Sequence, residues 1–212
     1  MRGADVPLDA TSAMVARDKS SHRGLRERTG LRELCAFSVN QDYLDEIGHL
    51  RALEYLEIPK FFTAKDLDPL LNLQNLRILK INSPRNILDF APISTLPKLE
   101  RLHITNAWKM GEIDWLRPLK DRLRVFSFDG DMYRNAHLNS LAPLEGFDLV
   151  ALLLGNTKIG DTSLAPVQSM QNLRFLQASS SIPRSEYESL HKALPQLKCC
   201  WFHDEAWERL RA

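Results

Sequence analysis

The chain has 212 residues, of which 28 are Lys or Arg, 27 are Asp or Glu, and 44% are hydrophobic. This length and apolar content are sufficient for one substantial core. The net charge of +1 provides no general attraction to phosphate backbones or anionic lipid, so we expect neither nucleic acid nor a membrane as a partner.

Cysteine usage and the lack of targeting signals indicate the cytoplasm. Cys35, Cys199 and Cys200 are odd in number and have no metal-ligand spacing, which favours a reducing compartment. No apolar run reaches the roughly 18 residues of a membrane helix, and residues 1–30 lack the apolar core of a secretory signal. We therefore expect a cytoplasmic protein without metal or cofactor, and leave delivery by a Sec-independent route open.

Residues 1–30 are highly charged, with six basic and four acidic side chains. Two interpretations are open. The segment is either a frayed N-terminal arm or a degenerate repeat that caps the protein. In the second interpretation Met14 and Ala16 align with Phe37 and Val39, one repeat further along the chain.

From Leu31 onward the pattern LxxLxxLxI recurs, first closely and then with substitutions. One leucine per unit serves as an anchor, and eight units can be counted: Leu34, Leu53, Leu76, Leu99, Leu123, Leu149, Leu173 and Leu197. The first interval is 19 residues and the later ones are 23–26. A period of this size, kept over so many units, indicates a repeat architecture.

Each unit has two halves with different periods. In the second half apolar residues alternate, as in LKI at 79–81, which predicts a short strand with one buried face. In the first half they occur at every third position, as from Leu67 to Leu76, which predicts a 3₁₀ or short helical turn. Pro69, Pro92 and Pro166 mark where these turns begin, because proline is tolerated in the first turn of a helix.

No unit of this kind can bury its leucines alone, so the units must stack, and crossovers of this length make the strands parallel. We predict an α/β fold in which residues 31–204 form a solenoid of about eight repeats of 23–26 residues. Its concave face is a parallel β-sheet, and its convex face carries short 3₁₀ or α segments. We also predict that residues 205–212 form a short cap helix, in which Trp207 and Leu210 are three residues apart and cover the end of the stack.

This pattern resembles the leucine-rich repeat family, in its short-repeat branch of bacterial, phosphatase-regulatory and internalin-like proteins. The strand motif of that family is LxxLxLxxNxL, which LVALLLGNTKI at 149–159 matches except for Thr157 in place of asparagine. Other units also depart at the asparagine position, where they have Asp42, Phe61, Pro84, Ala107, Asp131 and Ser181. The resemblance implies a non-catalytic binding scaffold and does not identify the partner.

Four positions per strand are expected to face the concave side, and three of them give rows across the repeats. The first row is Ala36, Tyr55, Ile78, Arg101, Val125, Ala151, Phe175 and Cys199, and the second is Ser38, Glu57, Lys80, His103, Ser127, Leu153, Gln177 and Trp201. The third row is Asn40, Pro59, Asn82, Thr105, Asp129, Gly155, Ser179 and His203. Because aromatic and arginine side chains dominate binding hot spots, we predict protein contacts at Tyr55, Glu57, Ile78, Lys80, Arg101, His103, Val125, Asp129, Phe175 and Trp201. The alternative is that packing within the sheet, or a covering N-terminal arm, accounts for them.

The loops after the strands offer a second candidate surface. Phe61 and Phe62, Trp108 and Met110, and Met132 and Tyr133 lie at similar offsets in their repeats. In the family such residues often complete the core, so burial is the alternative. Trp108 and Tyr133 are the preferred contact residues, because charged or polar residues flank them.

We therefore expect a scaffold for a protein or peptide partner, with no small-molecule substrate. Two narrower roles are alternatives: a bacterial immunity protein that neutralises a toxin, and an effector delivered into another cell. A hydrolase is a more distant alternative, because Ser127, His103 and Asp129 are the residue types of a nucleophilic triad but no nucleophile elbow or oxyanion hole accompanies them.

Overall fold

The computed structural model describes residues 3–209. The chain divides into two compact units, which we call unit 1 (Met1–Lys109) and unit 2 (Met110–Ala212). Both consist of parallel strands alternating with short helices, as the two periods within each repeat predict.

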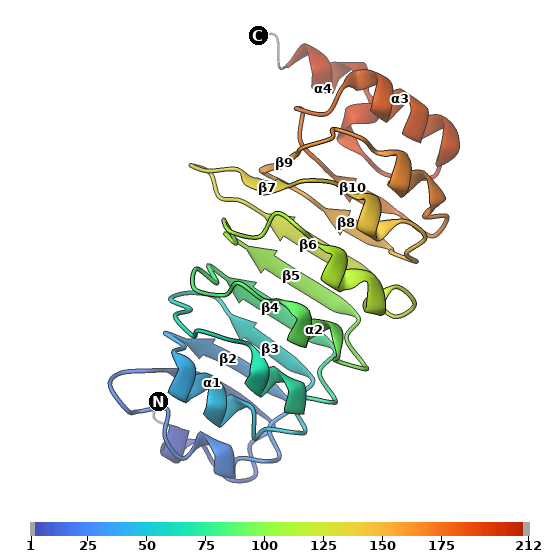
Figure 1. Cartoon of the computed structure of the whole chain (residues 1–212). Coiled ribbons are helices and arrows are strands. Elements are labelled where there is room, and N and C mark those ends of the chain that lie inside the picture. The colour runs from blue at the N-terminus through green and yellow to red at the C-terminus, as the bar shows by residue number, and fades with distance from the viewer. Residues whose placement is uncertain (1–2, 210–212) are drawn as a thin grey trace. The chain divides into compact units, whose positions relative to one another are not determined.

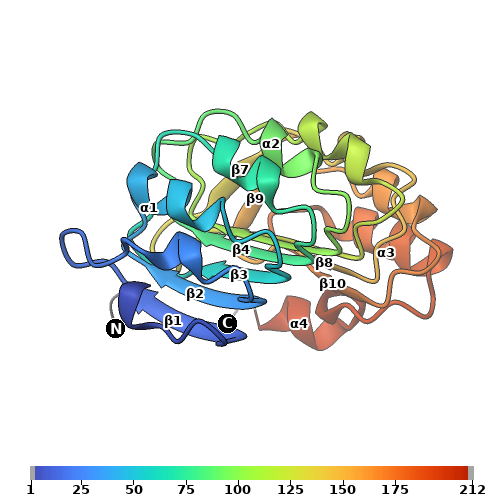
Figure 2. The same ribbon diagram turned by 90° about the horizontal axis from the view of Figure 1, so that it is seen from below.

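Unit 1 contains five parallel strands in chain order: β1 (Ser12–Ala16), β2 (Glu33–Phe37), β3 (Tyr55–Ile58), β4 (Ile78–Asn82) and β5 (Arg101–Thr105). The connections contain the helices α1 (Gln41–Ile47) and α2 (Ala91–Ser94) and the 3₁₀ helices η1 (Gly3–Asp5), η2 (Leu25–Glu27) and η3 (Asp68–Asn72). In Figures 1 and 2, α1 and α2 lie on one side of these strands. The other side is the predicted concave face, which we call the open face.

Unit 2 contains three parallel strands, β6 (Val125–Asp129), β8 (Ala151–Leu153) and β10 (Phe175–Gln177), and a separate parallel pair, β7 (Ala136–Leu138) with β9 (Thr157–Ile159). Its helical segments are η4 (Asp114–Leu119), η5 (Ala142–Leu144), η6 (Ala165–Ser169), α3 (Arg184–Ala193), η7 (Cys200–Phe202) and α4 (Asp204–Glu208).

The core of each unit is made by the repeat leucines. In unit 1 Leu56 of β3, Leu79 of β4 and Leu102 of β5 pair with one another and are fully buried. The residues before and after each leucine on its strand face the opposite side, which is the open face. Pro69 and Pro92 stand in the first turn of η3 and α2, where the missing proline N–H costs no hydrogen bond. The predicted fold class, parallel strands with short 3₁₀ or α segments, is confirmed.

The expected register of the first repeat is wrong by three residues. Leu34 pairs with Leu56, so Leu31 rather than Leu34 is equivalent to Leu53. The interval to the next anchor becomes 22 residues instead of 19, closer to the other repeats. Ala36, expected on the open face, is fully buried, and Glu33 and Cys35 take the outward positions. In this register Leu34 and Ala36 are fully buried and Phe37 is half-buried.

Residues 3–28 of unit 1 fold against the first repeats. β1 pairs with β2 over five residues, with Val15 inward and Met14, which is 62% exposed, outward. The expected alignment of Met14 with Phe37 is wrong, because Met14 pairs with Cys35.

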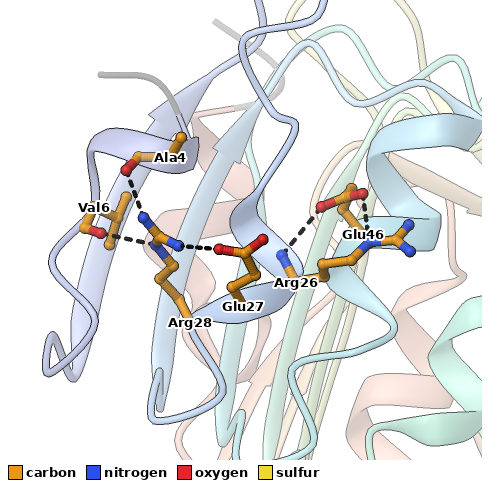
Figure 3. Close-up of polar contacts among 6 residues, drawn as sticks. All are labelled: Ala4, Val6, Arg26, Glu27, Arg28 and Glu46. Carbon is orange, nitrogen blue, oxygen red and sulfur yellow. Dashed lines mark hydrogen bonds and ion pairs between the residues drawn. The ribbon is translucent and has the colours of Figure 1, made fainter.

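A network of charged side chains, of which Arg28 and Glu46 are buried and Arg26 and Glu27 exposed, joins this N-terminal segment to α1 (Figure 3). Arg28 donates to the backbone oxygens of Val6 and Ala4 at 2.8 and 2.5 Å and pairs with Glu27. The backbone N–H and Nε of Arg26 donate to the two carboxylate oxygens of Glu46 in α1, at 3.1 and 2.7 Å. Glu46 is buried, so this pairing offsets the cost of removing its charge from water.

At the end of unit 2 three aromatic rings pack together. Trp201 lies 6.1 Å from Tyr187 and 5.0 Å from Trp207 between ring centroids. The indole N–H of Trp207 donates to the backbone oxygen of Trp201 at 2.8 Å. α4 occupies part of the predicted cap helix, whereas Leu210 lies outside the described residues. The division into arm, repeats and cap at residues 30 and 204 stays a prediction.

Candidate protein-binding face

Two rows of side chains cross the open face of unit 1. The pairing of β3, β4 and β5 places Tyr55, Ile78 and Arg101 in one row and Glu57, Lys80 and His103 in the next. Both rows agree with the predicted register, because these repeats have uniform lengths. Arg101 is exposed and the other five side chains are half-buried, so all six can contact a partner.

Three of these side chains form a connected group. The hydroxyl of Tyr55 donates to the carboxylate of Glu57, and Lys80 Nζ lies 3.8 Å from Glu57 Oε2 and 5.3 Å from the centre of the Tyr55 ring. The hydrogen bond with Tyr55 raises the pKa of Lys80, so its ammonium stays charged at neutral pH. This group holds an aromatic ring and a cation in position before any partner arrives, which lowers the entropy cost of binding.

His103 lies beside this group and is uncharged at neutral pH. Burial lowers the pKa of the imidazole, and the cations Lys80 and Arg101 lower it further. The positive charge of the open face therefore comes from Lys80 and Arg101, and His103 contributes a neutral hydrogen-bonding group.

The loop aromatics of unit 1 divide into exposed and buried members. Phe61 is 70% exposed and Phe62 is 2% exposed. Trp108, a predicted contact residue, is half-buried. The sequence pattern predicts that the neighbours Phe61 and Phe62 follow a strand, but it does not indicate which of the two rings enters the core.

In unit 2 the predicted first row continues as Val125, Ala151 and Phe175. Phe175 is 48% exposed, and Lys198 Nζ lies 5.5 Å from the centre of its ring. The expected alignment of the last repeat is wrong by one residue, because Phe175 pairs with Lys198 rather than Cys199. A single bridge replaces a strand here, since the chain turns into η7 at once.

Trp201 consequently leaves the second row. It lies in η7, where its indole N–H donates to the backbone oxygen of Ala178 at 2.7 Å. This bond and the ring contacts with Tyr187 and Trp207 fix the position of Trp201 at the end of unit 2, so no contact with a partner is needed to explain it.

Asp129 lies at the carboxyl end of β6, half-buried against the next repeat. A side chain at Gly155 would come within 2.6 Å of Asp129 Oδ1, so the carboxyl group needs a glycine opposite it. Burial raises the pKa of Asp129 to about 6, and a hydrogen bond from Ser127 partly opposes that rise. Asp129 is thus an ionisable group of unit 2 that titrates close to neutral pH.

The longest repeat presents Tyr133 on a tight turn. Asp131 Oδ1 accepts hydrogen bonds from the backbone N–H groups of Tyr133 and Arg134, both at 2.8 Å, and Asp131 N–H donates to the oxygen of Arg134 at 2.9 Å. Tyr133 is 91% exposed and Met132 is 81% exposed. The turn therefore holds two large side chains in solvent on an ordered backbone.

The three residues of the hydrolase alternative have other roles in their units. Ser127 is buried, and its hydroxyl bonds to Asp129 on the same strand. His103 belongs to β5 of unit 1. Within residues 3–209 no three His, Cys, Asp or Glu side chains converge as a metal site, and no helix there has the length and apolarity to cross a bilayer.

Two solved structures with a similar fold are internalins of Listeria monocytogenes. An internalin (inlF) from Listeria monocytogenes has a TM-score of 0.61 and 18% identity over 86% of this chain and 50% of its own. An internalin C2 (inlC2) from the same species has a TM-score of 0.56 and 22% identity, over 82% of this chain and 72% of its own. This chain thus spans half the length of the first.

No protein-family model matches the chain, and no curated protein sequence is similar to it. The structural likeness, at identities of 18% and 22%, is a likeness of fold. Together with the stacked parallel strands and buried leucines of both units, it shows that this chain has the leucine-rich repeat fold.

Proposed function

We propose that the chain is a non-catalytic scaffold that binds a protein or peptide through the open face of unit 1 and the adjoining loops. The supporting observation is the group of Tyr55, Glu57 and Lys80 beside Ile78 and Arg101. These side chains alternate along β3, β4 and β5 with the buried leucines of the core, and they combine aromatic, aliphatic and cationic groups in neighbouring strands. Such a combination is typical of the centre of a protein interface.

We also propose contact residues on unit 2 and in a loop of unit 1, and a bacterial source for the protein. Val125, Asp129, Phe175 and Tyr133 are proposed contacts on unit 2, and Trp108 is proposed on unit 1. The similar structures are bacterial, and we include a bacterial origin in the proposal.

Partner capture tests this function. The full chain is used to capture a partner from extracts, the partner is identified by mass spectrometry, and the purified pair is titrated by calorimetry. We expect Tyr55→Ala and Arg101→Ala each to weaken binding about 30-fold, equivalent to roughly 2 kcal/mol. Arg51→Ala is the matched control, because Arg51 is an exposed arginine in the turn before β3.

Unchanged affinity in both open-face variants, with circular dichroism showing a folded chain, would refute the proposed site. The identity of the partner, a toxin or a protein of another cell, decides between the two narrower roles.

A further inference from the structure

A pocket of about 270 Å³ opens at the carboxyl-terminal edge of the unit 1 sheet, beside the open face. Its walls are residues 59–63, which follow β3, residues at and after the end of β4, and Asn106 after β5. The volume is just below the range of about 300–1,000 Å³ for small-molecule sites. It therefore suits a side chain of a partner better than a whole cofactor.

The charged residues of this pocket are all cationic. Lys60 and Arg85 line it, and no acidic residue does. Both side chains belong to exposed residues, and neither forms an ion pair with any residue in the described part of the chain. The arginines at 26, 28, 32 and 77 of the same unit each have a carboxylate partner, whereas those at 17, 23, 51 and 101 have none among the described residues. The pocket is distinguished by two cations that line it together without such a partner. Two cations without such a partner at one pocket favour an anionic ligand.

The backbone of the pocket supplies further donors. The N–H groups of Lys60, Phe61 and Phe62 donate no hydrogen bond to any residue within 3–209. Phe61 has a φ of 57°, in the left-handed region. Consecutive N–H groups around a residue of this conformation form a concavity that binds anions. A carboxylate can accept several such hydrogen bonds at once.

The ring of Phe61 adds an apolar surface at the rim. A bulky residue is rare at positive φ, and the residues directly after β2, β4 and β5 that adopt it are the small polar Ser38, Ser83 and Asn106, with φ of 59°, 56° and 58°. Phe61 and Lys19, three residues after β3 and β1, are the larger side chains at positive φ in unit 1. At 70% exposure the ring contributes little to the core, so burial does not explain a phenylalanine in this strained place. Contact with a partner does explain it.

We infer that this pocket, on the basis of the proposed function, receives the carboxylate of an Asp or Glu side chain of an acidic peptide segment of the partner, and that an adjacent apolar residue of the segment packs on Phe61. Lys60, Arg85 and the free N–H groups bind the carboxylate.

An NMR titration of the ¹⁵N-labelled full chain tests the inference. The probes are the blocked tripeptides acetyl-Leu-Asp-Leu-amide and acetyl-Leu-Asn-Leu-amide, which differ only in charge. We expect the Asp peptide to shift the amide signals of residues 60–62 with a Kd on the order of 1 mM. We expect the Asn peptide to bind at least about tenfold more weakly, a difference of about 1.4 kcal/mol.

Matched variants assign the binding to the pocket. The double variant Lys60→Gln with Arg85→Gln should weaken the Asp peptide at least about tenfold, whereas Lys65→Gln, an exposed lysine outside the pocket, should leave it unchanged. Phe61→Gly removes the ring and the strain together, so it should weaken the peptide without unfolding the chain. Dispersed amide signals confirm that each variant is folded.

Three results would overturn the inference: no shifts at residues 60–62, equal binding of the two peptides, or acetate or a thymidine oligonucleotide binding as tightly as the Asp peptide. Any of these leaves the proposed function standing if partner capture still depends on Tyr55 and Arg101.

Discussion

Thr157 shows how one residue can replace the asparagine of the repeat motif. Its Oγ1 lies 2.7 Å from the backbone oxygen of Phe128 and 3.0 Å from that of Gly155, so the hydroxyl bonds to backbone at the ends of two strands of unit 2. In unit 1, Pro84 and Ala107 occupy this position and are buried, whereas Phe61 occupies it in the repeat of β3 and is 70% exposed. With the corrected register the first repeat has Val39 there, also buried, instead of Asp42. At Val39, Pro84 and Ala107 apolar contact thus takes the place of an asparagine side chain, whereas Phe61 points to solvent.

Asp129 makes stability depend on pH. Its pKa rises from 3.8 to about 6 on folding, mainly through burial, so the folded state holds the proton more tightly than the unfolded state. The stability that this proton contributes is present below about pH 4 and is lost as the pH rises to about 6.

We therefore expect Asp129→Asn to stabilise the chain at pH 7, where the native residue is a half-buried carboxylate. The gain should be on the order of 1 kcal/mol, discounted because the group is only half-buried, and should disappear at pH 4. Thermal unfolding at both pH values measures it, and the exposed Asp121→Asn is the control. An equal effect of Asp129→Asn at both pH values would contradict the assignment.

At the scale of elements, α4 and an aromatic cluster cover the last repeat of unit 2. α4 packs Trp207 against Trp201 and Tyr187 at the end of unit 2, and Tyr187 in turn donates to the oxygen of Ser179 at 2.8 Å. A terminal repeat needs such a cover, because it has no neighbour to bury its outer side.

Removal of this cover should destabilise the chain. We expect Trp207→Ala to cost about 1–2 kcal/mol, less than the roughly 3–5 kcal/mol of a fully buried tryptophan because Trp207 is half-buried. Deletion of 205–212 should lower the melting temperature by several degrees. Glu208→Ala, on the exposed side of α4, should have no effect. Calorimetry measures all three, and a deletion as stable as the full chain would refute the capping role.

Within each unit the repeats contact their neighbours, so local stability varies along the chain. In unit 1, β3 and β4 are paired on both sides, whereas β1 pairs only with β2 among the described residues. β1 is also bonded to α1, where the Tyr43 hydroxyl donates to the backbone oxygen of Val15 at 3.0 Å. We expect amide protons of β1 to exchange faster than those of β3 and β4.

Glu46→Ala tests the contribution of α1, because it removes the buried partner of Arg26. We expect exchange in β1 to accelerate at least about tenfold, which corresponds to roughly 1.4 kcal/mol, with β4 unchanged. Glu54→Ala, which removes an exposed ion pair with Arg32, should change exchange little. Hydrogen exchange with mass spectrometry measures this, and uniform acceleration over unit 1 would contradict the prediction.

Much of the fold and part of the candidate site could be predicted from the sequence. Strand positions, helical turns and their prolines follow from local periodicity, since alternate residues of a strand face opposite sides. For the same reason the rows of β3, β4 and β5, from Tyr55 to His103, were predictable. Their repeats have equal lengths, so one register satisfies every leucine.

Only the tertiary structure determined the strand register and the buried side chains where the repeats are irregular or where the series of repeats ends. Leu31 rather than Leu34 became the first anchor, and Lys198 rather than Cys199 the last outward residue, because register depends on the side chains that fill the core between neighbouring repeats. The choice between Phe61 and Phe62 as the buried ring, and the meeting of Lys60 with Arg85, depend on loops that follow different strands. Sequence by itself determined the repeated scaffold, because its signal is local; contacts between repeats determined which side chains the scaffold brings together.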